Sequence, residues 1–215
     1  GGVRLKPIEL RIDVSGMTGL PGALHTAVSV FVPELRKRLS PPLVVFAFPG
    51  GGYSRGYFHI EWPGLAGYSQ AEHHVRAGFV FVACDHLGVG DSSLPDPAVL
   101  TFETVPAANR ATVDAVMALL ESGTLVDGLE PLRGAVRIGI GQSMGGCFLV
   151  VQQALYRSFD AIAVLGYSAI QTVLPVPPGG GSAPLSASEQ FRYGFHQEDV
   201  PRELVHADLG RGYPV

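Results

Sequence analysis

The chain has 215 residues, of which 47% are hydrophobic and only 16% are charged. This length is enough for one large domain, and a hydrophobic fraction this high excludes an intrinsically disordered chain. The formal net charge is −4 and the 15 basic residues are scattered, so the sequence offers no concentrated basic face for a nucleic acid. The low charge favours a fold whose secondary structure is buried on both faces.

Two segments that alternate apolar and polar residues open the chain. They are residues 9–14 and 25–32, and a turn sequence at residues 19–22 lies between them. Alternation with a period of two is typical of a strand with one buried face. We therefore predict an antiparallel pair of strands at one edge of a sheet.

Short, continuous apolar runs follow, as is typical of parallel strands that are covered by helices on both faces. These runs are residues 43–48, 78–84, 136–140 and 161–165. Helical patterns separate them, at residues 67–77, 105–122 and 145–158. The alternation predicts an α/β fold, with a mostly parallel sheet, helices on both faces and right-handed crossovers.

The last part of the chain has a different texture. A stretch rich in proline and glycine follows the fourth apolar run, and a polar segment with a helical pattern follows that stretch. We expect the α/β core to cover residues 1–168. Residues 169–215 are expected to form a cap or lid.

The cysteines and the start of the chain bear on its compartment. Cys84 and Cys147 lie in or after apolar runs, so we expect buried free thiols and no disulfide. The sequence contains no run of about 18 uncharged apolar residues, so no membrane span is predicted. The first residues lack a basic-then-apolar signal pattern. A cytoplasmic location is the default prediction, and a processed export signal is the alternative.

The sequence Gly-Gln-Ser-Met-Gly-Gly at residues 141–146 directly follows the third apolar run and opens a predicted helix. In this strand-to-helix context the pattern G-x-S-x-G is typical of a strained turn that lifts a serine above the sheet. Gly141 and Gly145 avoid collisions with the neighbouring strand and helix. We therefore predict that Ser143 is a nucleophile and that Met144 N–H, at a helix N-terminus, stabilises an oxyanion. A glycine-rich turn with an incidental serine is the alternative.

A glycine run at residues 50–52 follows the first apolar run and Pro49. Glycines allow backbone amides to approach a ligand without obstruction by side chains. Together with Ser143, the run predicts the second half of an oxyanion hole, with Gly51 as the best donor and Gly52 as the next. A flexible turn is the alternative.

The sequence Asp-His-Leu-Gly-Val-Gly-Asp-Ser at residues 85–92 follows the second apolar run. Its aspartates and histidine are residue types found in metal sites and acid–base sites. We favour instead a structural loop, in which these side chains cap turns.

These pieces together resemble the α/β-hydrolase family. The resemblance rests on the glycine loop at 49–52, the D-x-x-G-x-G-x-S loop at 85–92 and the elbow at 141–145, which occur in the expected order within residues 40–170. Pro49 stands where many members have histidine, which leaves the backbone donor role intact. The resemblance implies an eight-stranded, mostly parallel sheet, a Ser–His–acid triad and a lid after the sixth strand.

In this family the acid usually follows the seventh strand and the histidine follows the eighth. The run at 161–165 is the sixth strand by our count, and no later run resembles a seventh or eighth. The less common acid position, after the sixth strand, holds Tyr167 and Ser168, neither of which is a carboxylate. No histidine ends a late apolar strand; they are His25, His59, His73, His74, His86, His196 and His206. We infer that the chain is the N-terminal part of a longer hydrolase, and that a missing C-terminal segment or a second chain supplies the acid and the histidine.

The predicted function is that of a serine hydrolase, which cleaves carboxylic esters of a small to medium hydrophobic substrate through an acyl-enzyme on Ser143. Tyr53 and Trp62 are expected to line an aromatic substrate pocket. The sequence holds no metal cluster and no nucleotide-binding loop, so no cofactor is expected.

Two alternative functions and one oligomeric state stay open. One is related serine chemistry, namely the hydrolysis of carbon–carbon, thioester, lactone or amide bonds, or acyl transfer. The second is a hydrolase fold that binds a ligand without catalysis. A homo-oligomer also stays open.

Overall fold

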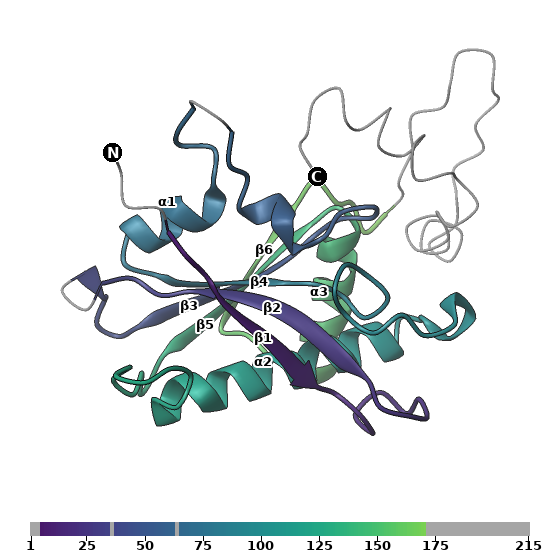
Figure 1. Ribbon diagram of the computed structural model, residues 1–215. Helices are drawn as coiled ribbons and strands as arrows, with labels where there is room; N and C mark the ends of the chain where they lie inside the picture. The colour runs from purple at the N-terminus through teal and green to yellow at the C-terminus, as the bar shows by residue number, and fades with distance from the viewer. Residues whose placement is uncertain (1–4, 35–36, 63–64, 171–215) are drawn as a thin grey trace, which may run out of the picture.

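The computed structural model describes residues 5–34, 37–62 and 65–170. Their central element is a six-stranded sheet with the order β1-β2-β4-β3-β5-β6 (Figure 1). The strands are β1 (Ile8–Asp13), β2 (His25–Phe31), β3 (Leu43–Phe48), β4 (Val80–Cys84), β5 (Val136–Gln142) and β6 (Ala161–Leu165). The connections contain the 3-10 helices η2 (Arg55–Phe58) and η3 (Pro97–Val99) and the α-helices α1 (Gln70–Arg76), α2 (Thr104–Ser122) and α3 (Met144–Tyr156).

The pairing of the strands confirms the predicted α/β fold class. β1 pairs antiparallel with β2 at the edge of the sheet, as predicted, and β2 also pairs antiparallel with β4. The other three pairings, β3 with β4, β3 with β5 and β5 with β6, are parallel. The sheet is therefore mixed, and its parallel half carries the glycine loop and the predicted elbow.

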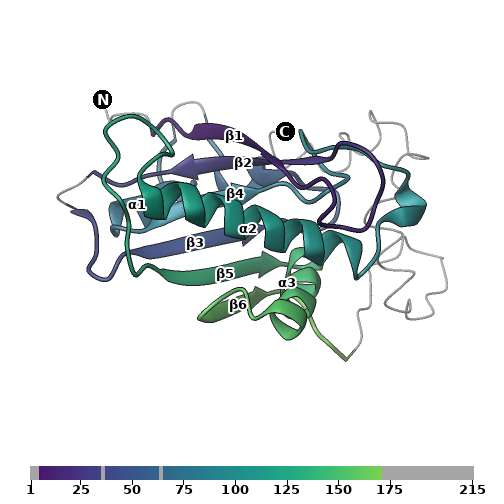
Figure 2. The same cartoon turned by 90° about the horizontal axis from the view of Figure 1, so that it is seen from below.

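Helices cover both faces of the sheet. Figure 2 shows α2 and α3 on the face toward the viewer, with α1 behind the strands. Side chains of a strand point alternately to the two faces. Phe46 and Phe48 of β3 therefore join the core under α2 and α3, whereas Val45 and Ala47 join the core under α1 and η2. All four are at most 1% exposed, and burying a large apolar side chain stabilises a fold by about 1.5–3 kcal/mol.

The start of α1 differs from the prediction of a helix over residues 67–77. Ser69 is the N-cap, since its hydroxyl accepts a hydrogen bond of 3.0 Å from Glu72 N, and the helix begins at Gln70. Tyr68, which lies within the predicted range, precedes the helix and is 59% exposed. The assignment of Tyr68 to the helix was therefore wrong, because the serine cap begins the helix later than the apolar spacing indicates.

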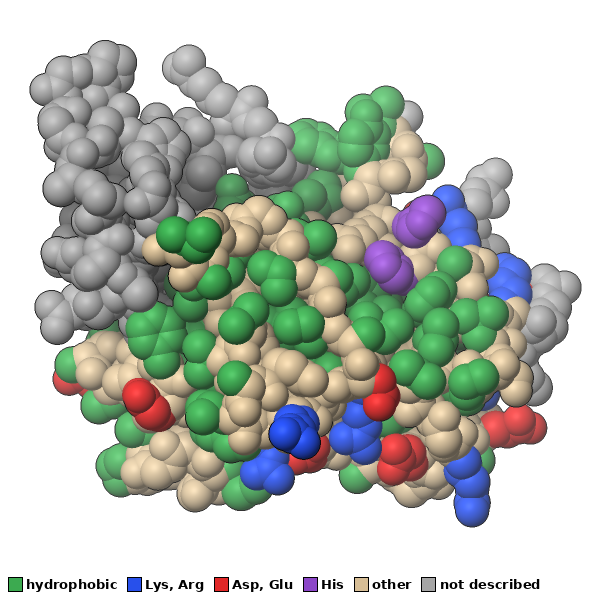
Figure 3. All heavy atoms as spheres, turned by 180° about the vertical axis from the view of Figure 1, so that it is seen from behind, with side chains coloured by type: hydrophobic (Ala, Val, Ile, Leu, Met, Phe, Trp, Pro, Cys, Tyr) green, Lys and Arg blue, Asp and Glu red, His purple; other side chains and the backbone are tan. Residues whose placement is uncertain are grey.

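The predicted cap lies almost wholly outside the described residues, since residues 171–215 are not among them. The boundary at residue 168 and the cap therefore stay predictions. Within the described part, no helix is both long enough and apolar enough to span a membrane. On the face shown in Figure 3, hydrophobic and uncharged side chains occupy most of the area, and charged side chains gather mainly along the lower edge.

Candidate active site

Ser143 occupies the junction between β5 and α3. Its backbone has φ 50° and ψ −116°, a conformation that residues other than glycine rarely adopt. Its N–H donates a hydrogen bond of 2.8 Å to Leu165 O at the end of β6, and its carbonyl accepts from Gly146 N at 2.9 Å. The junction is thus a sharp, strained turn that opens a helix, which is the geometry that the G-x-S-x-G pattern predicts.

Glycines allow the backbones around Ser143 to come into contact. A Cβ atom at Gly141 would collide with the Gly145 carbonyl, and a Cβ atom at Gly145 would collide with the carbonyl oxygens of Phe48 and Pro49. The second contact joins the serine turn to the end of β3. The turn and the glycine loop at residues 49–52 therefore meet through main-chain atoms.

The glycine loop is a tight turn. Tyr53 N donates to Gly50 O at 3.2 Å, and Gly52 has φ 79°, a value that favours glycine at this place in a turn. Gly50 packs against the side chain of Gln142, so close that a Cβ atom at Gly50 would collide with Gln142 Oε1. Two contacts, at Gly145 and at Gln142, therefore place the loop beside Ser143. The donor roles of Gly51, Gly52 and Met144 stay predictions.

Comparison with known proteins decides the fold. No family model matches the sequence, and no curated protein matches it. Three similar solved structures are a proline iminopeptidase from Mycobacterium smegmatis (17% identity, TM-score 0.53), a peroxisomal α/β-hydrolase from Saccharomyces cerevisiae (14%, 0.55) and a probable hydrolytic enzyme from Pseudomonas aeruginosa (18%, 0.52). They cover 75%, 86% and 73% of this chain.

The chain has the α/β-hydrolase fold. It spans 44%, 50% and 40% of the lengths of those three structures, in the same order. The identities are low, so the likeness establishes the fold and not the reaction.

In this α/β-hydrolase fold, the loop after β4 holds Arg55, the first residue of η2, shortly after the glycine loop. The Asp85 carboxylate is fully buried and accepts hydrogen bonds from Arg55 N at 2.6 Å and Asp91 N at 3.0 Å. It also forms an ion pair with the Arg55 guanidinium. Ser92 Oγ accepts from Ala27 N at 3.0 Å. The side chains of the loop at 85–92 thus hold neighbouring backbone, as expected of a structural loop.

Sequence reasoning missed Arg55. The only available signal is that Arg55 is the sole charged residue between Arg38 and Glu61. Burial by itself would lower the pKa of Arg55, but the carboxylates of Asp85, Asp91 and Glu9 together outweigh burial and raise this pKa.

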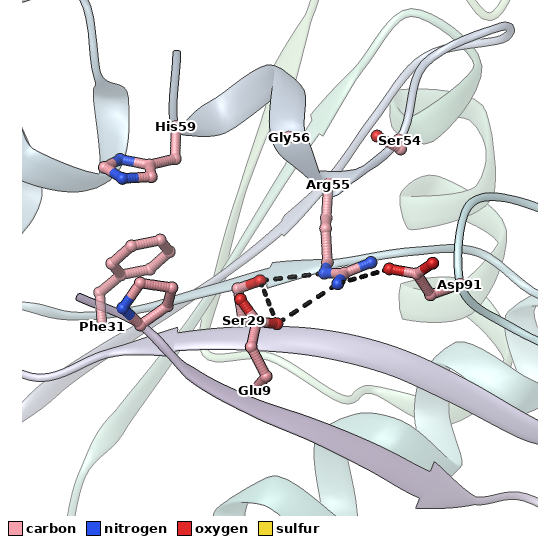
Figure 4. Close-up of a pocket in the computed structure, with 9 residues that line it drawn as sticks. Glu9, Ser29, Phe31, Ser54, Arg55, Gly56, His59 and Asp91 are labelled. Carbon is pink, nitrogen blue, oxygen red and sulfur yellow. Dashed lines mark hydrogen bonds and ion pairs between the residues drawn. The ribbon is translucent and has the colours of Figure 1, made fainter. Parts of the chain in front are cut away.

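A polar hollow of about 260 Å³ surrounds Arg55 (Figure 4). The guanidinium donates to Ser29 Oγ at 2.9 Å and contacts Asp91 and Glu9 at 2.8 and 3.3 Å. At the other end of the hollow, the ring of His59 packs on Phe31, with 4.8 Å between ring centroids. No residue from 141 to 145 is among those lining this hollow. Its charges therefore serve to hold the loop, and the reaction proposed below does not use it.

The imidazoles that form hydrogen bonds within the described residues bond to partners other than Ser143. His25 bonds to Ser93 and Arg11, His59 to Ser69, His74 to Gln70 O, and His86 to Pro49 O. His73 is exposed on α1. His196 and His206 lie outside the described residues. The described part of the chain therefore brings no imidazole onto the hydroxyl of Ser143.

The aromatic residues predicted for a substrate pocket lie in the segment after the glycine loop. The ring of Tyr53 packs on Tyr57 with 5.2 Å between centroids, and Trp62 forms an antiparallel bridge with Leu65. The ring contact anchors Tyr53 locally and the bridge pairs the backbone of Trp62, and the role of both residues in binding stays a prediction.

Both cysteines are free, as expected, but only Cys84 is fully buried, since Cys147 is half-buried. Burial raises the pKa of each thiol. At Cys147 a hydrogen bond with the Tyr167 hydroxyl opposes that rise.

Proposed function

We propose that the protein is a serine hydrolase that cleaves carboxylic esters of a small to medium hydrophobic substrate through an acyl-enzyme on Ser143. The observation that carries the proposal is the backbone of Ser143, at φ 50° and ψ −116°, where β5 turns into α3. Strain of this kind in a residue other than glycine costs about 1–3 kcal/mol and is concentrated at functional sites.

The reaction follows from the chemistry of a serine hydroxyl. Ser143 Oγ attacks the ester carbonyl while an imidazole takes its proton. The tetrahedral oxyanion accepts hydrogen bonds from Met144 N–H and Gly51 N–H, with Gly52 N–H as the next candidate donor. The positive end of the α3 dipole adds to this stabilisation. The imidazole then protonates the leaving alcohol, and a water molecule releases the acyl group as a carboxylic acid.

We further propose that the imidazole and its carboxylate come from a segment or a second chain that pairs with β6. Within the described residues, β6 is an edge strand. Its Ile162, Val164 and Leu165 are 37–42% exposed, whereas β3 is almost wholly buried. An exposed apolar edge is a template for strand addition.

The test compares the intact wild-type protein with Ser143→Ala, using short-chain p-nitrophenyl esters and a fluorophosphonate label. Ser122→Ala is the matched control, because Ser122 is an exposed serine at the end of α2. We expect Ser143→Ala to abolish labelling and to lower turnover by up to about 10⁶-fold. Ser122→Ala should change neither. Equal turnover by wild type and Ser143→Ala would remove Ser143 from the mechanism.

A hydrolase fold that binds a ligand without catalysis is the second candidate function. It is favoured by one observation, that each hydrogen-bonded imidazole in the described residues bonds to a partner other than Ser143. The same experiment separates the two candidates. Binding of the ester by the intact protein, with neither fluorophosphonate labelling nor turnover, would favour the binding function.

A further inference from the structure

His86 is a fully buried histidine that the reaction proposed above does not use. It lies in the loop after β4, next to Asp85, and is 0% exposed. Its ring stacks on Phe48 at the end of β3, with 5.7 Å between centroids and 21° between planes. On another side it packs against Phe148 of α3, at 5.1 Å. The ring is therefore fixed between the strand that precedes the glycine loop and the helix that follows Ser143.

Two hydrogen bonds determine which ring nitrogen carries the proton. Nε2 lies 3.0 Å from the carbonyl oxygen of Pro49, which can only accept, so Nε2 must donate. Nδ1 lies 3.1 Å from Asn109 Nδ2, an amide donor on α2 that is 1% exposed, so Nδ1 must accept. Both nitrogens are satisfied by the neutral tautomer with its proton on Nε2.

The carbonyl that His86 holds is the first of the glycine loop. The Pro49 carbonyl also lies against Gly145, where a Cβ atom would collide with it. It is thus held between the imidazole on one side and the serine turn on the other. Two residues later comes Gly51, the predicted oxyanion donor. The orientation of the peptide plane after Pro49 directs the following backbone toward or away from Ser143.

The segment from Pro49 to Arg55, which contains the glycine loop, is held at both ends by adjacent residues. Asp85 holds the backbone N–H of Arg55 at the far end, and His86 holds Pro49 O at the near end. The side chains of one dipeptide thus define the span of this segment.

We propose that His86 is a positioning residue of the oxyanion hole, which fixes Pro49 and thereby aims the Gly51 N–H at the carbonyl oxygen of the substrate. This assignment rests on the proposed function, since it needs an oxyanion to position against. His86 does not touch the substrate and transfers no proton. It acts through the Pro49 carbonyl, and Asn109 acts through His86 by selecting the tautomer.

The test uses two amide substitutions in the intact protein that differ in reach. Glutamine in His86→Gln can place its amide N–H near the position of Nε2, whereas asparagine in His86→Asn can reach only the position of Nδ1. His74→Asn is the matched control, because His74 is a half-buried histidine of α1 that bonds to a backbone carbonyl, Gln70 O at 2.9 Å, and packs on Phe79 and Phe81 away from the loop.

The readouts are kcat and KM for a p-nitrophenyl ester and hydrogen exchange of the backbone amides at residues 50–54. Deleting an oxyanion donor costs about 10²–10³ in kcat, and His86→Asn misaligns the donor without deleting it. We therefore expect His86→Asn to lower kcat by about 10–100-fold with KM within about 3-fold, and to speed exchange at residues 50–54. His86→Gln should stay within about 5-fold of wild type, and His74→Asn should change neither readout.

The exchange measurement separates this proposal from the proposed function. If the wild type hydrolyses no ester, the proposed function fails, and the exchange rates still report whether His86 holds the loop. Equal kcat and equal exchange in His86→Gln and His86→Asn would overturn the positioning role. An exchange difference without a kcat difference would also overturn it, because the loop would then be held without any effect on the oxyanion hole. If His86→Asn does not fold, Asn109→Leu removes the donor to Nδ1 and is judged by the same two readouts.

Discussion

Replacing Arg55 with methionine should destabilise the protein far more than removing an arginine at the surface. Methionine keeps the apolar stem but leaves the Asp85 carboxylate, which is 0% exposed, without its cation. Removing one partner of a buried ion pair costs about 3–5 kcal/mol. The backbone N–H groups of residues 55 and 91 still donate to this carboxylate, at 2.6 and 3.0 Å. We therefore expect a loss of about 3 kcal/mol, the lower end of that range.

The same substitution at Arg110 provides the matched control. Arg110 pairs with Asp114 on α2 at 2.9 Å, with side chains 45% and 43% exposed, and it lies over the ring of Tyr156. Exposed pairs of this spacing contribute about 0.3–0.5 kcal/mol and an exposed cation–π contact about 0.5–1 kcal/mol. Arg110→Met should therefore lower the free energy of unfolding by no more than about 1.5 kcal/mol.

The assay is equilibrium unfolding in urea, followed by circular dichroism and by the fluorescence of Trp62, the single tryptophan. A third variant tests the cause. Asp85→Asn added to Arg55→Met removes the unpaired buried charge, so the double variant should be more stable than Arg55→Met alone. The reasoning is refuted if Arg55→Met and Arg110→Met lose the same free energy, or if Asp85→Asn destabilises the Arg55→Met protein further.

Three further predictions concern the backbone of Ser143, the imidazole of His86 and the thiols. The Ser143→Gly protein should have a free energy of unfolding about 1 kcal/mol higher than the Ser143→Ala protein, because glycine relieves the backbone strain at φ 50° and alanine does not. Urea titrations measure both values, and equal stabilities would argue against strain. Burial lowers the pKa of His86, so below about pH 6.5 the unfolded chain binds a proton that the folded chain excludes, and stability falls as pH falls. His86→Gln should reduce that fall between about pH 7.5 and pH 5.5, and an unchanged slope would contradict the cause. A thiol reagent should modify the half-buried Cys147 before the buried Cys84 in the folded protein and both at one rate in guanidinium, as resolved by mass spectrometry.

The parallel strands could be predicted because their sequences are short, continuous apolar runs. Residues 43–48 and 161–165 are uniformly apolar between polar or glycine-rich neighbours, and β3 and β6 occupy those residues. Where the start of a helix differs from its predicted position, a local interaction sets the boundary. α1 begins at Gln70 because the hydroxyl of Ser69 caps it. Apolar spacing carries no information about such a cap.

The serine turn could also be predicted, because the pattern of glycines around Ser143 is local in sequence. The glycines around Ser143 record the close approach of neighbouring backbone. The contacts of His86 and Arg55 were not open to prediction in the same way. His86 meets Pro49 across 37 residues, and Arg55 meets Asp85 across 30. Such contacts depend on the strand order, in which β4 lies beside β3, and no local pattern encodes that order.

The contact between the serine turn and the glycine loop has a consequence for engineering. Gly141 and Gly145 touch neighbouring carbonyl groups and Cα atoms, so the two halves of the site meet through main-chain atoms. Side chains at their margin, such as Tyr53, are not part of that contact. Under the proposed function, libraries that vary these margins can therefore search for substrate preferences while the backbone turn at Ser143 stays in place. The glycines themselves should be kept out of any such library.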